Sequence, residues 1–189
     1  MAKSREIPDL EATDSLRLAA AKVVEVRTRE LFAEAHGVLD VSDIERVHDM
    51  RVASRRLRAV LEIFASCFPR AELRAVLTDV KALADALGAR RDPDVQIAGL
   101  RGFSQAVGRA EQPGVEHLLE RFAMQQADGN GRLEAALEHA DASDLRGRLE
   151  ALVDGARRQA AAEGESESEE ELRGADEGAD GALGDEAAL

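Results

Sequence analysis

The sequence predicts an all-α protein, most simply an antiparallel helical bundle with short connections. Apolar residues recur at the helical period along most of the chain, and no segment shows the apolar–polar alternation of a half-buried strand. The 189 residues include no Trp, no Tyr and only five Phe, so the core must be built from Leu, Val, Ile and Ala. That mixture favours helices over a β-sandwich, which would need more aromatic and β-branched residues.

The first two helices are expected over residues 10–35 and 42–68. Ser42 and Glu45 have the spacing of a capping box, in which each side chain satisfies a free backbone N–H of the other residue. The second helix is expected to stop at Pro69, because proline cannot continue the helical hydrogen bonds.

Glycine and proline set the expected boundaries of the next two helices. A third helix over residues 71–87 should end at Gly88. The next helix should begin within residues 92–94, with Asp92 as its N-cap and Pro93 at its first helical position.

The last helical stretch covers residues 113–158, with expected breaks at the Asp-Gly-Asn-Gly sequence of residues 128–131 and near Asp141. These boundaries predict one helical domain between two irregular ends. The flexible N-terminus, the helical domain and an acidic tail are expected over residues 1–9, 10–160 and 161–189.

The negative charge of the chain is concentrated at its C-terminal end. Residues 163–189 contain eleven acidic residues and one basic residue, so the rest of the chain carries only −3 of the total charge of −13. High like charge with few apolar side chains predicts a disordered tail. Such a tail would act either as a solvating segment or as an anionic competitor for a cationic site in the body.

One face of the second helix carries mostly positive charge. At 100° per residue, His48, Arg51, Arg55 and Arg58 form a single ridge opposite an apolar face. Like charges at this spacing repel each other by roughly 0.2–0.5 kcal/mol per pair. We therefore expect an anion to relieve the repulsion, because arginine donates paired hydrogen bonds to phosphate or carboxylate oxygens.

Further basic residues follow this ridge along the chain. Lys81 and Arg74 share one face of the third helix, and an antiparallel pairing of helices two and three would place both basic faces in one groove. Arg90 and Arg91 precede the expected start of the next helix, where free N–H groups also favour anions.

Several other kinds of site are excluded or disfavoured. The single cysteine, Cys67, allows neither an internal disulfide nor a cysteine-based zinc site, and it is expected in the core. The sequence contains no phosphate-binding glycine loop and no defensible Ser-His-Asp set, so neither an enzyme nor a cofactor is expected. No apolar stretch is long enough for a membrane span and no signal core begins the chain, so a cytoplasmic location is expected. Three histidines show no metal-ligand spacing: His36, His117 and His139.

Two sequence blocks, taken in their order along the chain, resemble a known family. Residues 47–58 read Val-His-Asp-Met-Arg-Val-Ala-Ser-Arg-Arg-Leu-Arg and are followed by Leu61 and Phe64. Residues 87–95 read Leu-Gly-Ala-Arg-Arg-Asp-Pro-Asp-Val and are preceded by Lys81-Ala-Leu. Both blocks are similar to those of the conserved histidine α-helical domain, abbreviated CHAD, and the resemblance extends loosely over residues 10–158.

The resemblance implies a helical bundle that binds inorganic polyphosphate in a basic channel without catalysis of its own. An association with polyphosphate granules is a further expectation, and the histidine spacing predicts no metal site. The resemblance also implies a set of phosphate-binding residues, although Arg56 would point away from the ridge on a straight helix. These are His48, Arg51, Arg55, Arg56, Arg58, Lys81 and Arg91.

The family's complete domain contains two related helical halves, and this chain resembles only the first. From Gly114 onward no second His-and-Arg block is found. The channel is therefore expected to be half-formed, so that binding is weakened or a homodimer rebuilds both halves about a two-fold axis.

The residues are also compatible with three other functions. A nucleic-acid binder could use the same ridge, but the acidic body and the lack of Trp and Tyr for base stacking disfavour it. A phosphotransfer module would accept a phosphoryl group on His48. An interaction scaffold would use the arginine ridge to dock an acidic partner or the chain's own tail.

Overall fold

The structure is a computed structural model that describes residues 5–180, with side chains described through residue 166. Over this part of the chain the only regular elements are helices, which confirms the all-α prediction. In chain order they are α1 (Leu16–Ala33), α2 (Ile44–Ile63), the 3-10 turn η1 (Ala65–Cys67), α3 (Arg70–Ser104), α4 (Gln112–Ala142) and α5 (Leu145–Asp180).

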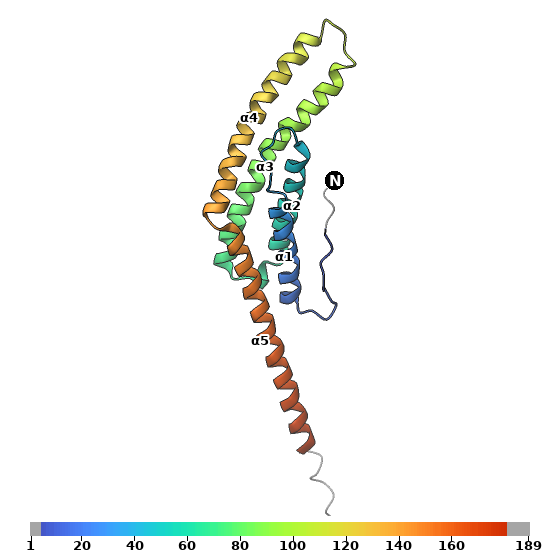
Figure 1. Cartoon of the computed structure of the whole chain (residues 1–189). Coiled ribbons are helices and arrows are strands. Elements are labelled where there is room, and N and C mark those ends of the chain that lie inside the picture. The colour runs from blue at the N-terminus through green and yellow to red at the C-terminus, as the bar shows by residue number, and fades with distance from the viewer. Residues whose placement is uncertain (1–4, 181–189) are drawn as a thin grey trace, which may run out of the picture.

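The helices form a bundle with two projecting ends (Figure 1). α2 packs between α1 and α3, α4 lies along α3, and α5 returns along α1. The far part of the α3–α4 hairpin extends beyond α1 and α2 at one end, and α5 continues past the bundle at the other. α2 and α3 are therefore sequential antiparallel neighbours, and the surface between them, which we call the α2–α3 groove, contains two hollows.

One apolar core joins the five helices. Each helix contributes at least one leucine that is fully buried, and burial of such a side chain stabilises the fold by roughly 1.5–3 kcal/mol. Examples from successive helices are Leu31, Leu57, Leu87, Leu133 and Leu149. Cys67 is also buried in this core, as predicted.

The beginnings of α1 and α2 differ from the prediction. α1 starts after Ser15, whose side chain accepts a hydrogen bond from the backbone N–H of Leu18. The predicted capping box at the start of α2 is absent, because the N–H and hydroxyl of Ser42 both donate to Asp40 Oδ1 instead. Asp43 therefore precedes α2 without a side-chain cap.

The predicted break between residues 88 and 92 is wrong, since α3 continues through Pro93. Pro93 has no N–H to offer the carbonyl of Ala89, four residues earlier. That carbonyl lies against Gly129 of α4, where an added Cβ would be 2.7 Å from Ala89 O and 3.0 Å from Arg90 Cα. The predicted break at residues 128–131 is wrong for the same reason, because Gly129 serves the close approach of α3 and α4 rather than a turn.

A buried polar cluster lies beside this close approach. Arg90 and Asp94 form an ion pair whose side chains are both 0% exposed. Gln126 Nε2 donates to Asp94 Oδ1 at 2.6 Å, and Arg90 Nε donates to Asn130 Oδ1 at 3.1 Å. The prediction that Arg90 binds an anion at a helix N-terminus is therefore wrong, because its side chain is buried and connects α3 to α4.

The break expected near Asp141 is confirmed at the junction of α4 and α5. Asp144 has a positive φ of 47°, and its Oδ1 accepts a hydrogen bond from Gly147 N at 3.1 Å. α5 then continues as helix backbone to Asp180, and the acidic tail expected over residues 161–189 extends beyond the described residues. Glu, Ala, Leu and Arg are good helix formers, and they supply much of this segment.

Candidate polyanion-binding site

The basic ridge of α2 lies along α3 and borders a first hollow between the two helices, with a volume of about 330 Å³. Four of the seven predicted site residues come together here: His48, Arg51, Arg55 and Arg91. The remaining lining is contributed by Val52, Asp92 and Val95.

Arg51 and Arg55 supply the uncompensated charge of this hollow. Arg51 is half-buried and Arg55 is exposed. Neither forms an ion pair with a carboxylate among the side chains that the structure describes. Their guanidinium groups therefore keep their donors available for an anion, as the ridge predicts.

Arg91 faces them from α3 and is held in place by the first turn of α2. Its Nη1 donates to the backbone oxygen of Ile44 at 3.2 Å, and its Nη2 lies 3.8 Å from Glu45 Oε1. A backbone acceptor fixes the side chain without cancelling its charge, and the exposed Glu45 is too distant for a strong pair. Arg91 thus remains a positive group across the groove from Arg51 and Arg55.

His48 is half-buried at the same end of the groove. It is flanked by arginines of its own helix and by Asp92 across the hollow. Its side chain therefore lies within reach of whatever occupies the hollow.

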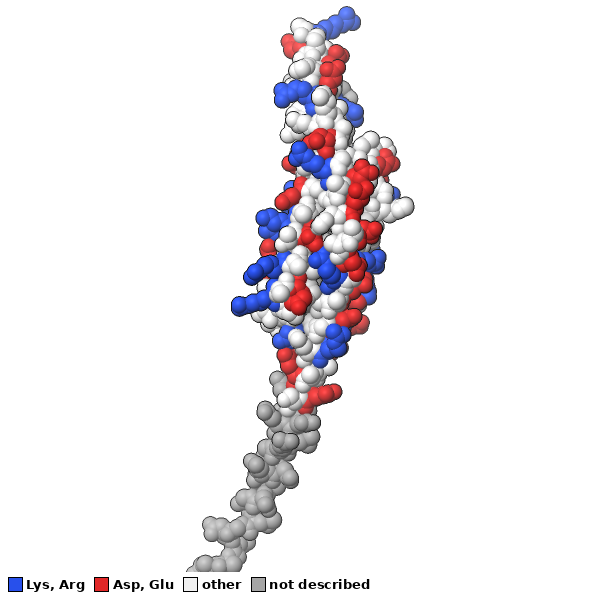
Figure 2. Space-filling model, turned by 90° about the vertical axis from the view of Figure 1, so that its left-hand side faces the viewer, with Lys and Arg blue, Asp and Glu red and all other residues white. Residues whose placement is uncertain are grey.

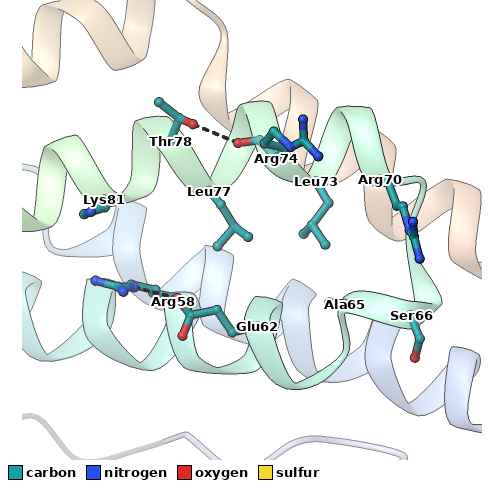
Figure 3. A pocket seen from close by; sticks show the side chains of 10 residues that line it. All are labelled: Arg58, Glu62, Ala65, Ser66, Arg70, Leu73, Arg74, Leu77, Thr78 and Lys81. Carbon is teal, nitrogen blue, oxygen red and sulfur yellow. Dashed lines mark hydrogen bonds and ion pairs between the residues drawn. The ribbon is translucent and has the colours of Figure 1, made fainter.

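A second and larger hollow, of about 710 Å³, continues the groove toward the end of α2 (Figure 3). Its charged lining consists of four basic side chains and one acidic side chain, with apolar and hydroxyl groups between them. The charged residues are Arg58, Arg70, Arg74, Lys81 and Glu62. Arg58 and Lys81, both predicted, reach it from opposite helices.

Arg58 differs from the other ridge arginines because it has a partner. Its Nε lies 2.8 Å from Glu62 Oε1, one helical turn later. The hydrogen bond and the charge of Glu62 raise the pKa of the Arg58 guanidinium above its ordinary value. The expectation of an entirely uncompensated ridge is wrong at this position, and the i,i+4 spacing of the two residues was the signal for it.

Arg56 lies apart from the other six predicted residues. It is half-buried on a different side of α2 and contributes to neither hollow. This placement agrees with the straight-helix geometry.

Arg70 is a groove residue that the sequence reasoning missed. The signal was available, because Arg70, Arg74 and Lys81 follow each other at intervals of four and seven residues and so share one helix face. Arg70 lies at the first position of α3, near the η1 turn (Figure 3).

The side of the molecule formed by α4 carries charges of both signs. Seen from the side of α4, acidic and basic side chains are interspersed over most of the surface (Figure 2). Mixed signs of this kind make an ordinary solvated surface. Among the charged side chains that line the two hollows, basic ones predominate.

Two other kinds of site can be assessed over the described residues. No group of three or more His, Cys, Asp or Glu residues there could hold a metal ion. No helix in the same part of the chain is both long and apolar enough to cross a bilayer.

The sequence matches one protein-family model. The family model described as CHAD domain matches residues 22–187, a span that includes the whole of α2 and α3 and therefore both hollows. No curated protein matches the chain. Since the match extends over most of the sequence and encloses the basic groove, the chain belongs to the CHAD domain family.

Proposed function

We propose that this protein binds inorganic polyphosphate, or a closely related polyanion, along the α2–α3 groove and performs no chemistry on it. The observation that carries the proposal is the first hollow, where Arg51 and Arg55 lack carboxylate partners among the described side chains and face Arg91 across the groove. Membership of the CHAD family, which is associated with polyphosphate-related proteins, supports the same ligand class.

The spacing of the ridge suits a polymer better than a single phosphate. Arg51, Arg55 and Arg58 follow each other at rises of about 6 and 4.5 Å along the helix axis. A chain of linked phosphates offers a comparable series of negative groups, so several guanidinium groups can bind at once. Charge-assisted hydrogen bonds and the release of counterions would supply the binding free energy.

The test is polyphosphate binding by the wild type and by Arg51→Ala/Arg55→Ala, measured by calorimetry at two salt concentrations. The double variant should bind long-chain polyphosphate about tenfold or more weakly, because each lost charged hydrogen bond contributes about 1 kcal/mol or more. Its affinity should also fall less steeply with salt, since fewer counterions are released.

A matched control is Arg101→Ala/Arg132→Ala, which removes two positive charges from exposed positions outside both hollows. It should bind within about twofold of the wild type, because charges beyond a Debye length of roughly 10 Å are screened. Equal losses in the two double variants would reject the groove as the site. Displacement of polyphosphate by DNA at equal phosphate concentration would instead favour a nucleic-acid ligand.

A homodimer forms part of the same proposal. One copy supplies one α2–α3 groove, and a second copy related by a two-fold axis would supply the other half of a channel. Light scattering on the calorimetry samples should then give the mass of a dimer. A monomer that binds long-chain polyphosphate tightly would show that one groove is enough.

A further inference from the structure

The second hollow is larger than the first, and two of its four basic side chains lie outside the predicted site. Arg70 and Arg74 lie outside the two blocks that resemble the family, yet both line it. Neither side chain, nor that of Lys81, has an ion-pair partner among residues 5–166. With Arg58 and Glu62 included, the lining carries a charge of +3.

The two hollows follow each other along the same pair of helices. On α2 the first ends at Arg55 and the second begins at Arg58, about 4.5 Å further along the axis. On α3 the basic residues extend from Arg91 to Arg70, a rise of about 31 Å. A ligand seated at one end of this groove therefore meets more positive charge only if it is long enough to reach the other end.

Glu62 is the one acidic side chain in the second hollow. It lies 52% exposed at the α2 side and is bound to Arg58, while Lys81 faces the pair from α3 (Figure 3). An anion entering this hollow must either displace Glu62 from Arg58 or bind beside a negative charge. Glu62 is therefore an internal counterion of Arg58 and would compete with any anion that enters the second hollow.

We propose that the second hollow is a chain-length-sensing extension of the polyphosphate site, with Arg70 and Arg74 as its specificity-determining residues and Glu62 as its competing anion. This inference rests on the proposed function of the groove. A short phosphate oligomer fills the first hollow alone, whereas a long chain continues past Arg58 and gains the contacts of the second.

The experiment compares tripolyphosphate with long-chain polyphosphate on three proteins by calorimetry: the wild type, Arg70→Ala/Arg74→Ala and Arg51→Ala/Arg55→Ala. The Arg70/Arg74 variant should bind the long chain about tenfold more weakly and tripolyphosphate within about twofold of the wild type. The Arg51/Arg55 variant should lose affinity for both ligands. Because Arg70 and Arg74 are exposed, the fold should survive, and far-UV circular dichroism checks this.

A substitution that increases the affinity gives an independent readout, because misfolding would only decrease the affinity. Glu62→Gln should tighten long-chain binding about threefold or more, since it frees Arg58 and removes a repelling charge. Its matched control is Glu150→Gln, which breaks an ion pair of the same i,i+4 spacing with Arg146 outside both hollows. Glu150→Gln should leave the affinity within about 1.5-fold of the wild type.

The failures are distinguishable. If the wild type does not bind long-chain polyphosphate, the proposed function fails and this inference fails with it. If the wild type binds and Arg51→Ala/Arg55→Ala weakens binding, but Arg70→Ala/Arg74→Ala weakens both ligands equally or neither, only the length-sensing extension is overturned. A Glu62→Gln variant that behaves like Glu150→Gln overturns the role of Glu62.

Discussion

Gly129 offers the sharpest test of how α3 and α4 are held together. Replacing glycine by alanine inside a helix normally stabilises the helix by about 1 kcal/mol. At Gly129 the new Cβ would meet Ala89 O at 2.7 Å and Arg90 Cα at 3.0 Å, both of them backbone atoms that cannot rotate away. The helices must separate, and overpacking of this kind costs about 1–3 kcal/mol. Gly129→Ala should therefore destabilise the protein.

Gly131 is the matched control two residues further along the same helix. It is exposed, and an added Cβ would have no atom within 4 Å. Gly131→Ala should follow the ordinary propensity and stabilise the protein by up to about 1 kcal/mol. The two substitutions are chemically identical, so their opposite signs would isolate the contact with α3.

Urea unfolding followed by far-UV circular dichroism measures both variants, since the chain has no Trp or Tyr for fluorescence. With a slope of about 2 kcal/mol/M, the midpoints of the two variants should differ by about 1 M or more. Equal midpoints, or a Gly129→Ala variant more stable than the wild type, would refute the close approach of the two helices and the account of Pro93 that depends on it.

Two further predictions concern buried or half-buried carboxylates. Asp94→Asn should destabilise the protein by about 3–5 kcal/mol in the same urea assay, because it leaves the guanidinium of Arg90 buried without its counterion; a variant as stable as the wild type would contradict the buried pair. Burial raises the pKa of Asp79, but the hydrogen bonds and charges of Arg148 and His139 outweigh it and hold that pKa below its ordinary value. The stability that Asp79 contributes is therefore present at neutral pH and is lost as the pH falls below about 3.9 through the lowered pKa. Asp79→Asn should cost about 1 kcal/mol at pH 7 and progressively less toward pH 3, and a cost independent of pH would contradict the ion pair.

The sequence predicted those parts of the fold that depend on local pattern. The helical class, the amphipathic second helix and the break near Asp141 all follow from residue spacing and from neighbouring residues in the chain. The ridge of Arg51 and Arg55 could be predicted for the same reason, because a helix fixes the relative directions of its own side chains.

The errors arose where a contact between distant segments overrides a local signal. In the sequence, Pro93 and Gly129 each indicate the end of a helix. In the structure, both lie inside continuous helices, and together they permit the close approach of α3 and α4. Because the third helix was expected to end at residue 87, Arg90 and Arg91 were assigned the same environment. In the continuous α3, Arg90 is fully buried against α4 and Arg91 faces the groove.

The second hollow was predicted only in part, because the sequence analysis placed Arg74 and Lys81 in a groove with the α2 ridge but did not include Arg70. Its residues come from the end of α2, the η1 turn and the beginning of α3, so the pocket exists only once the two helices are paired. The partner of Arg58, in contrast, could have been identified from the spacing of Glu62 alone.

The projecting end of the α3–α4 hairpin has a consequence for how the molecule opens. Beyond the reach of α1 and α2, each of these helices has only the other to pack against (Figure 1). Backbone amides in that arm need only the local separation of two helices to reach water, whereas amides beside the groove need the whole bundle to come apart. Hydrogen exchange should therefore begin at the tip and slow toward Arg90, so that the part of α3 beside the α2–α3 groove is its most protected section.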